Sequence, residues 1–161
     1  SVSKDLTPGA VASAISENSV QAIICTFAPR SSNSCDACLS AARAWSVWEA
    51  STSKLMTDPA LIRKFSGGRF AEAFARIEAH YFINRGFFEH DDQLLRNAKR
   101  IRHIPGVIVQ GRYDVVCPMR SAWDLHRAWP EAELVVVPDA GHSMGEDGIR
   151  AALLAHTDRY A

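Results

Sequence analysis

An acidic residue and a histidine in the second half of the chain each follow a short apolar run. Asp114 lies in the segment 111–118 (Gly-Arg-Tyr-Asp-Val-Val-Cys-Pro), and His142 lies in the segment 140–143 (Ala-Gly-His-Ser). A carboxylate that orients an imidazole, and an imidazole that moves the proton of a nucleophile, are two parts of a Ser-His-Asp triad. The acid precedes the histidine, which is one of the chain orders in which such triads occur. The alternative is a turn aspartate and a loop histidine that have no partnership.

Two buried strands are expected to hold both residues at one edge of a sheet. A β-branched run at residues 107–109 lies between two glycines, and a second apolar run covers residues 134–137. Helices are expected over residues 120–129, with Trp123 on the apolar face, and over residues 149–160. This order predicts two parallel strands joined by a right-handed crossover. The acid and the histidine then follow the carboxyl ends of the strands, where ligands gather in open α/β sheets.

The chain before the first of these strands is expected to be mostly helical. A helix over residues 41–49 puts Ala41, Trp45 and Trp48 on one face, and Asp58-Pro59 begins a short helix. Gly67-Gly68 breaks the chain, and large apolar residues then recur at spacings of four, three and four, which predicts an amphipathic helix over residues 69–82. Those apolar residues are Phe70, Phe74, Ile77 and Tyr81. A further short helix is expected over residues 94–101.

Residues 1–40 form an N-terminal segment that the sequence does not place in any larger pattern. Within it, residues 10–17 read as a small-residue helix, residues 20–27 as a buried strand and residues 29–34 as a loop. Residues 41–103 form the helical region, and residues 104–161 form the two strand–helix units.

Composition sets the broad class of the protein. A chain of 161 residues with 47% hydrophobic and 22% charged residues is expected to be one ordinary soluble globular domain. Eighteen basic residues balance eighteen acidic ones, so nothing favours a nucleic-acid or anionic-membrane partner. No apolar run reaches the roughly 20 residues that span a bilayer. Four cysteines at this length do not suggest a secreted disulfide framework, and a cytoplasmic location is expected.

Several separate motifs carry a resemblance to one family. The segments 111–118 and 140–143, together with Trp-Asp-Leu-His at 123–126, resemble the proline iminopeptidases, the prolyl aminopeptidase branch of the α/β-hydrolases. Residues 41–49 look like the start of that family's helical cap, and residues 75–88 look like its substrate-binding segment. The motifs fall in the family's order from about residue 41 to the C-terminus. The resemblance implies an α/β fold: the C-terminal part of an α/β-hydrolase, with a helical cap segment (41–103) and the last two β-α units of a parallel sheet (104–161).

The resemblance also implies a role for four residues. By similarity, Asp114 is the orienting acid and His142 the general base, while Glu49 and Glu78 receive the protonated imino group of an N-terminal proline. Two carboxylates facing one pocket give a negative site that suits a secondary ammonium and explains exopeptidase specificity. The alternative for each glutamate is a solvated helix residue. Phe87 and Phe88, which could line an apolar pocket for the proline ring, are explained equally well by core packing. No metal or organic cofactor is implied.

The nucleophile that such a triad needs is not evident in this sequence. The family's serine lies in a Gly-x-Ser-x-Gly turn further upstream of the acid than the residues before Asp114 allow, so it is expected to precede Ser1. The oxyanion hole is expected to be missing with it. The segment 141–145 (Gly-His-Ser-Met-Gly) also fits Gly-x-Ser-x-Gly. A triad built on Ser143 would have to use His156 with Asp147 or Asp158, which share one helix with no strand end to present them, so a chance match is expected.

Cys35-Asp-Ala-Cys38 resembles a redox or metal half-site. A redox site requires a thioredoxin-like context and structural zinc requires four ligands, and the sequence offers neither. The motif is therefore interpreted as incidental.

The function expected from the sequence is release of N-terminal proline from small peptides by a serine-type exopeptidase, in a chain that lacks the nucleophile. Two alternatives stay open: a catalytically inactive fragment, and a different α/β-hydrolase such as an esterase or an epoxide hydrolase. A neutral substrate gives no reason for the pair Glu49 and Glu78, which weighs against the last of these. A parallel sheet reduced to its last strands exposes an apolar edge, so a marginal fold or poor solubility is expected.

Overall fold

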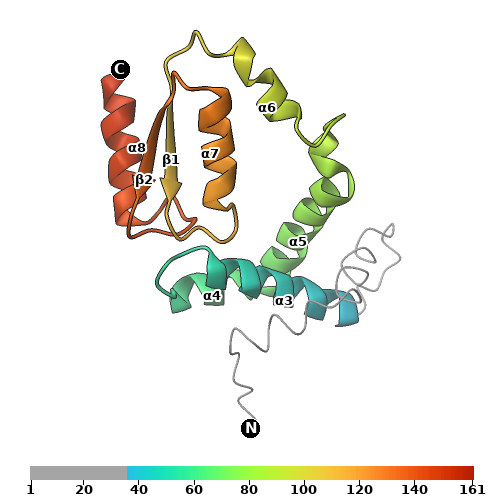
Figure 1. Cartoon of the computed structure of the whole chain (residues 1–161). Helices are drawn as coiled ribbons and strands as arrows, with labels where there is room; N and C mark the ends of the chain where they lie inside the picture. Colours follow the sequence, from blue (N-terminus) through green and yellow to red (C-terminus); the bar gives the residue numbers. More distant parts are fainter. Residues whose placement is uncertain (1–35) are drawn as a thin grey trace. The chain divides into compact units, whose positions relative to one another are not determined.

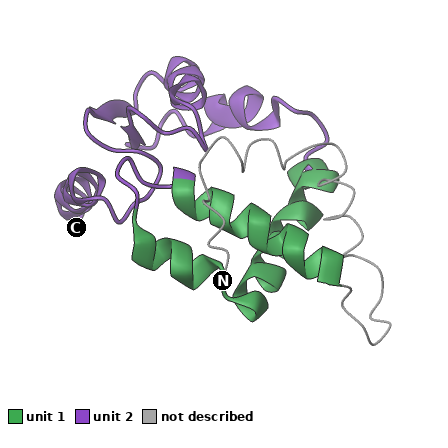
Figure 2. Cartoon of the chain, turned by 90° about the horizontal axis from the view of Figure 1, so that it is seen from below, with its two compact units in different colours: residues 1–51, 58–87 green, residues 52–57, 88–161 purple. Residues whose placement is uncertain are grey.

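The computed structural model describes residues 36–161 (Figure 1). The described residues form two compact units, coloured separately in Figure 2: residues 36–51 with 58–87, and residues 52–57 with 88–161. We call them unit 1 and unit 2. The helix, strand and loop expected within residues 10–34 lie outside the described residues.

Unit 1 consists of the expected helices, of which the first extends beyond the expected residues 41–49 at both ends. They are α3 (Asp36–Thr52), α4 (Pro59–Phe65), α5 (Gly68–Ile83) and the 3-10 turn η1 (Arg85–Phe87). The side chain of Asp58 caps α4 by accepting hydrogen bonds from the backbone N–H of Ala60 at 3.0 Å and of Leu61 at 3.1 Å. Pro59 follows at the first helical position, where its missing N–H has no cost. The sequence therefore predicted this helix start correctly.

The buried face of α5 differs from the expected one. Ala71, Ala75 and Ala79 are buried, whereas Ile77 is 61% exposed and Tyr81 is 54% exposed. In α3 the buried residues are likewise small, with Glu49 as the exception, and they are Ala42, Ser46, Glu49 and Ala50. Spacing of large apolar residues identifies a helix, but small residues on an adjacent face let other parts of the protein approach more closely. The predicted helix is present, but the face that carries its large apolar residues is not the buried one.

Unit 2 contains a parallel pair of strands between two helices. It comprises α6 (Gln93–Asn97), the 3-10 turn η2 (Ala98–Arg100), β1 (Val107–Gly111), α7 (Met119–Ala128), β2 (Glu133–Val137) and α8 (Asp147–Arg159). The strands run parallel, with Val107 opposite Glu133 and Gly111 opposite Val137. Both α7 and α8 contact both strands, and Figure 1 shows them on opposite sides of the pair. Within residues 36–161 the sheet has two strands, as the sequence predicted.

The core of unit 2 lies between the sheet and α8. Buried Val137, Ala140 and Ile149 form its centre, and Val109 and Leu153 pack against them. The expected apolar face of α7 is displaced by one residue, because Ala122 is the buried residue and Trp123 is 47% exposed. None of the helices described between residues 36 and 161 is long and apolar enough to cross a membrane.

The carboxyl ends of the two strands are joined through a close approach of two glycines. A Cβ added to Gly111 would lie 1.9 Å from the carbonyl oxygen of Gly141 and 2.8 Å from that of Ala140. The backbone N–H of Tyr113 also donates to the carbonyl of Ala140 at 3.0 Å. The loop after β1 and the loop after β2 are therefore in direct backbone contact, which only glycine at position 111 permits.

This contact predicts that Gly111→Ala destabilises unit 2. The added methyl group would collide with backbone atoms, and no side-chain rotation can relieve the collision. We therefore expect the free energy of unfolding to fall by at least about 1–3 kcal/mol. The measurement is urea unfolding followed by tryptophan fluorescence. Gly145→Ala is the matched control, since its Cβ would meet the Ser143 hydroxyl oxygen at 3.4 Å, an ordinary contact. Equal unfolding midpoints for the two variants would contradict the prediction.

Candidate active site

Asp114 lies in the turn that follows β1 and is held by backbone hydrogen bonds. Its Oδ1 atom accepts from the backbone N–H of Val116 at 3.0 Å and of Cys117 at 2.7 Å. The side chain is 6% exposed. An aspartate that accepts from the backbone two and three residues ahead has a fixed rotamer, because the turn and the side chain define each other. The orientation of the other carboxylate oxygen, Oδ2, is therefore fixed as well.

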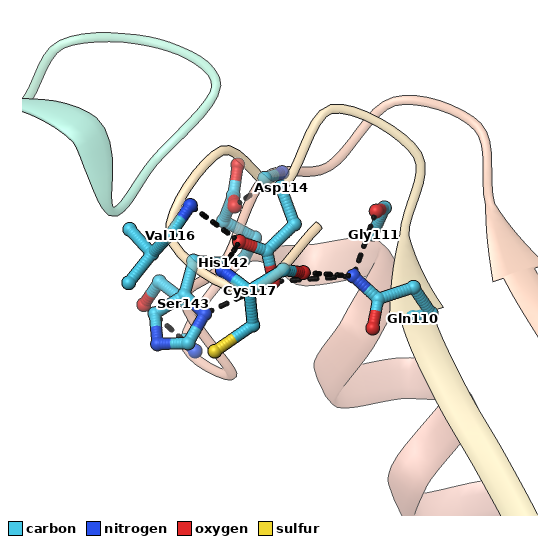
Figure 3. A network of polar contacts seen from close by, with 10 residues as sticks. Gln110, Gly111, Asp114, Val116, Cys117, His142 and Ser143 are labelled. Carbon is cyan, nitrogen blue, oxygen red and sulfur yellow. Dashed lines mark hydrogen bonds and ion pairs between the residues drawn. The ribbon is translucent and has the colours of Figure 1, made fainter. Parts of the chain in front are cut away.

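Gln110 supplies a further donor to the same carboxylate, and sequence reasoning missed it. The Nε2 atom of Gln110 donates to Asp114 Oδ2 at 3.2 Å and to the carbonyl of Cys117 at 3.0 Å (Figure 3). Gln110 is the one polar side chain in strand β1, whose sequence is Val-Ile-Val-Gln-Gly. That exception to the strand pattern was the available signal. Gln110 thus connects strand β1 to the turn that contains Asp114 through two hydrogen bonds.

His142 lies in the loop after β2 and faces Asp114. Its Nδ1 atom is 3.0 Å from Asp114 Oδ2, as Figure 3 shows. The imidazole side chain is 38% exposed. An ionised carboxylate only accepts hydrogen bonds, so this contact assigns the proton to Nδ1 and leaves Nε2 as the accepting nitrogen of the neutral ring. An imidazole in this tautomer, with an exposed ring, is arranged to take a proton from a nucleophile.

The structure does not assemble a triad around Ser143. The Ser143 hydroxyl oxygen accepts from the backbone N–H of Gly145 at 3.2 Å, which is a local turn contact. His156 Nδ1 is buried and has no hydrogen-bond partner among the described residues. Cys35 of the Cys-x-x-Cys motif lies outside the described residues. Within residues 36–161, no group of three or more His, Cys, Asp or Glu side chains is arranged to hold a metal ion.

The two glutamates singled out in the sequence both lie in unit 1. Glu78, on α5, accepts a hydrogen bond at 2.5 Å from the indole N–H of Trp45, on α3. Glu49 follows Trp45 by one helical turn and is 7% exposed. Residues four apart on a helix are neighbours, so Trp45 stands beside both carboxylates. Trp45 also contacts the ring of Phe82, with the ring centroids 6.0 Å apart.

The surroundings of Glu78 change its acidity. Burial raises the pKa of Glu78 above its ordinary value of 4.5, and the hydrogen bond from Trp45 opposes this by stabilising the ionised form. A solvated helix residue would not show this shift. The indole N–H of Trp45 was not recognised from the sequence, because its partner is on another helix.

Phe87 and Phe88 are not core residues, which was one of the two explanations left open. Phe87 is 60% exposed and Phe88 is 39% exposed. The ring of Phe87 packs edge-on against Tyr81, with the centroids 5.6 Å apart. Arg85, Gly86 and Phe87 all have left-handed backbone, with φ of 50°, 61° and 63°. Two of these are not glycines, so this turn is strained.

Comparison with known proteins gives the class of the chain. An α/β-hydrolase family model described as "TAP-like protein" matches residues 88–160. A probable proline iminopeptidase of Leptolyngbya boryana is 71% identical over 120 residues, which is 74% of this chain and 37% of that protein. Proline iminopeptidases of Xylella fastidiosa (strain Temecula1) and Arabidopsis thaliana are 58% and 56% identical, over 76% and 74% of this chain and 39% and 31% of theirs. The chain thus spans less than two fifths of the length of these relatives.

The chain therefore carries the C-terminal part of an α/β-hydrolase fold, as the sequence predicted. Within that class, the proteins it resembles are the proline iminopeptidases, so the resemblance drawn from its motifs is confirmed.

The geometry predicts the tautomer of His142. In Asp114→Asn, the amide group can present N–H instead of oxygen to Nδ1, so the neutral imidazole is expected to move from the Nδ1–H to the Nε2–H form. The measurement is the ¹⁵N chemical shifts of the two ring nitrogens at a pH where the ring is neutral. Asp124→Asn, at a partly exposed ion pair with Arg120, is the control and should leave both shifts unchanged. An Nδ1–H ring in both variants would contradict the assignment.

Proposed function

We propose that this chain supplies the acid–base pair and the amine-binding carboxylates of a serine-type prolyl aminopeptidase, which releases N-terminal proline from small peptides. The observation that carries the proposal is the hydrogen bond between His142 Nδ1 and Asp114 Oδ2. The proposal also draws on the similarity to proline iminopeptidases and on the surroundings of Glu78. In this scheme residues 41–103 are the helical cap region and residues 104–161 are the C-terminal core units.

In the proposed reaction, each residue has a distinct task. His142 takes the proton of the attacking serine at Nε2 and returns it to the leaving amine, and Asp114 holds the ring and stabilises its protonated form. No hydrogen bond is made to His142 Nε2 within residues 36–161, so in this scheme the serine and the oxyanion hole come from a part of the protein outside these residues. No metal or organic cofactor takes part. We place the reaction in the cytoplasm, on the cysteine content of the sequence.

Glu49 and Glu78 are proposed to select substrates by charge. The N-terminal proline of a peptide carries a secondary ammonium, while an internal peptide bond offers no charge at that point. A neutral ester or epoxide would not offset the cost of two partly or fully buried carboxylates on neighbouring helices. The proposal therefore favours a prolyl peptidase over an esterase or an epoxide hydrolase.

This assignment predicts binding of a small amine without any turnover. We expect the chain to bind L-prolinamide, and we expect N-acetyl-L-prolinamide, which lacks the charge, not to bind detectably. Glu78→Gln should weaken the binding of L-prolinamide about 10- to 100-fold, because a charge-assisted hydrogen bond contributes about 1.5–3 kcal/mol. Isothermal titration calorimetry measures both affinities. Glu72→Gln is the control on the same helix, since Glu72 pairs with Arg76. Equal binding of the acetylated compound would refute the charge-based selection.

The raised pKa of Glu78 predicts the pH dependence of that binding. The amine needs an ionised carboxylate, so affinity is present above the pKa of Glu78 and is lost as the pH falls through it. Since burial raises this pKa, the loss should have its midpoint above 4.5, the ordinary value for a glutamate. Trp45→Phe removes the hydrogen bond that lowers the pKa, so the midpoint should move to still higher pH. A midpoint at or below 4.5 in the unsubstituted chain would contradict the prediction.

A further inference from the structure

The loop that carries His142 is bonded to a short segment far away in the sequence. The backbone N–H of His142 donates to the carbonyl oxygen of Ser53 at 3.0 Å, and that of Ser143 donates to the same oxygen at 2.7 Å. Both partners belong to unit 2, which includes residues 52–57. One carbonyl therefore holds two consecutive residues of the loop.

The side chain of Glu146 joins the same two pieces of chain. Its Oε1 atom accepts from the backbone N–H of Gly141 at 2.7 Å, and its Oε2 atom accepts from the backbone N–H of Leu55 at 3.0 Å. Hydrogen bonds to an ionised acceptor are about twice as strong as neutral ones. The carboxylate thus bridges Gly141, the residue before His142, and Leu55, which lies 91 positions before Glu146 in the sequence.

Because the Glu146 carboxylate makes this bridge, it does not cap the helix that begins beside it. Glu146 is the N-cap residue of α8, and its side chain makes no capping hydrogen bond to that helix. An N-cap side chain that accepts from the first turn typically contributes about 1 kcal/mol to helix stability. The carboxylate is turned away from the helix toward Gly141 and Leu55, so its position is set by those two donors.

The lack of a side chain at Gly141 allows this bridge to form. A Cβ at this position would lie 3.0 Å from the backbone nitrogen of Leu55 and 3.3 Å from Glu146 Oε1. These distances are tighter than ordinary van der Waals contact. The absence of a side chain is what lets the two backbones share one carboxylate.

We infer that Glu146 is a positioning residue for His142: it fixes the loop against residues 53–55, so that the imidazole keeps its hydrogen bond to Asp114. The inference rests on the proposed function for its meaning, but its geometry is independent of turnover. Gly141 is buried, so removal of the carboxylate leaves one buried N–H without its acceptor. The loop then keeps its hydrogen bonds to the Ser53 carbonyl and from the Tyr113 N–H but loses its link to Leu55, and the partly exposed imidazole gains freedom to turn away from Asp114.

The test is Glu146→Gln in the full 161-residue chain, followed by NMR. Glutamine is isosteric, but one of its two ends is an N–H₂ group that opposes a backbone donor. We expect amide hydrogen exchange at Gly141 or Leu55 to quicken at least about tenfold, and we expect the Nδ1–H resonance of His142 to broaden or vanish. Exchange in β1 should be unchanged. Asp147→Asn is the matched control, because this neighbouring carboxylate is 93% exposed and pairs with Arg150; it should leave the His142 signal intact.

A sharp Nδ1–H resonance in Glu146→Gln, with exchange at Gly141 and Leu55 as slow as in the unsubstituted chain, would overturn the inference. Uniformly faster exchange across β1 and α8 would also overturn it, since that is what a general stabilising role predicts. If the variant does not fold, the unsubstituted chain provides the test. The backbone N–H groups of Gly141 and Leu55 should then be protected from hydrogen exchange by the Glu146 carboxylate, and exchange as fast as in an exposed loop would refute the bridge.

These results are separable from those that bear on the proposed function. Failure of L-prolinamide to bind would remove the aminopeptidase assignment and leave the NMR outcome untouched. An unaltered His142 signal in Glu146→Gln would remove the positioning role and leave the binding results untouched.

Discussion

The hydrogen bonds that converge on the Asp114 carboxylate are the constraint on which the site in unit 2 depends. One oxygen accepts from two backbone N–H groups of its own turn, and the other accepts from Gln110 and is paired with His142. All of these partners act as donors, as an ionised carboxylate requires. The turn, the strand and the histidine loop therefore share one electrostatic centre. The carboxylate is almost fully buried, so water cannot replace a hydrogen-bond partner that is lost. The negative charge would then remain buried without compensation.

The backbone around this centre is built to bring two loops together. A side chain on Gly111 would collide with the backbone of Gly141, and a side chain on Gly141 would press on the backbone of Leu55, so neither position accepts one without movement of its neighbours. The parallel register places the ends of β1 and β2 side by side, and the core of Val137, Ala140 and Ile149 holds them there. Packing thus fixes where the acid and the histidine lie, and hydrogen bonds fix how their side chains point. A small core is sufficient for this because the two residues follow neighbouring strand ends.

In unit 1, the burial of carboxylates lowers stability but creates a negatively charged site. Burying a carboxylate costs free energy unless partners offset it, and the raised pKa of Glu78 records this cost. The Trp45 indole recovers part of it, and it also stands one turn from Glu49. A site that holds negative charge away from water in this way is suited to a cationic ligand. The same cost explains why such carboxylates are not expected on an ordinary packed helix.

Local patterns in the sequence predicted the elements, while long-range partners were beyond their reach. The glycine-bounded run at residues 107–109 and the Asp58-Pro59 pair gave β1 and the start of α4, because each signal lies within a few residues of its effect. Asp114 and His142 are 28 residues apart, and their pairing was expected because each follows one of two neighbouring strands and because the motifs resemble those of one family. Glu146 and Leu55 are 91 residues apart, and Trp45 and Glu78 are 33 apart, so no periodicity could have connected them. The buried alanine face of α5 was missed because period alone does not say which of two adjacent faces is covered.

The central claim is that Asp114 and His142 are the acid and the base of a prolyl aminopeptidase. Its most direct test is to place the residues of this chain in a full-length relative. In a chimera, the 120 residues of the Leptolyngbya boryana protein that match this chain are replaced by the residues of this chain, and release of proline from a fluorogenic L-prolyl amide is measured. The account predicts that the chimera turns over the substrate, and that His142→Ala in the chimera abolishes turnover although the variant still unfolds cooperatively on heating. A folded chimera that releases proline equally well without His142 would contradict the account.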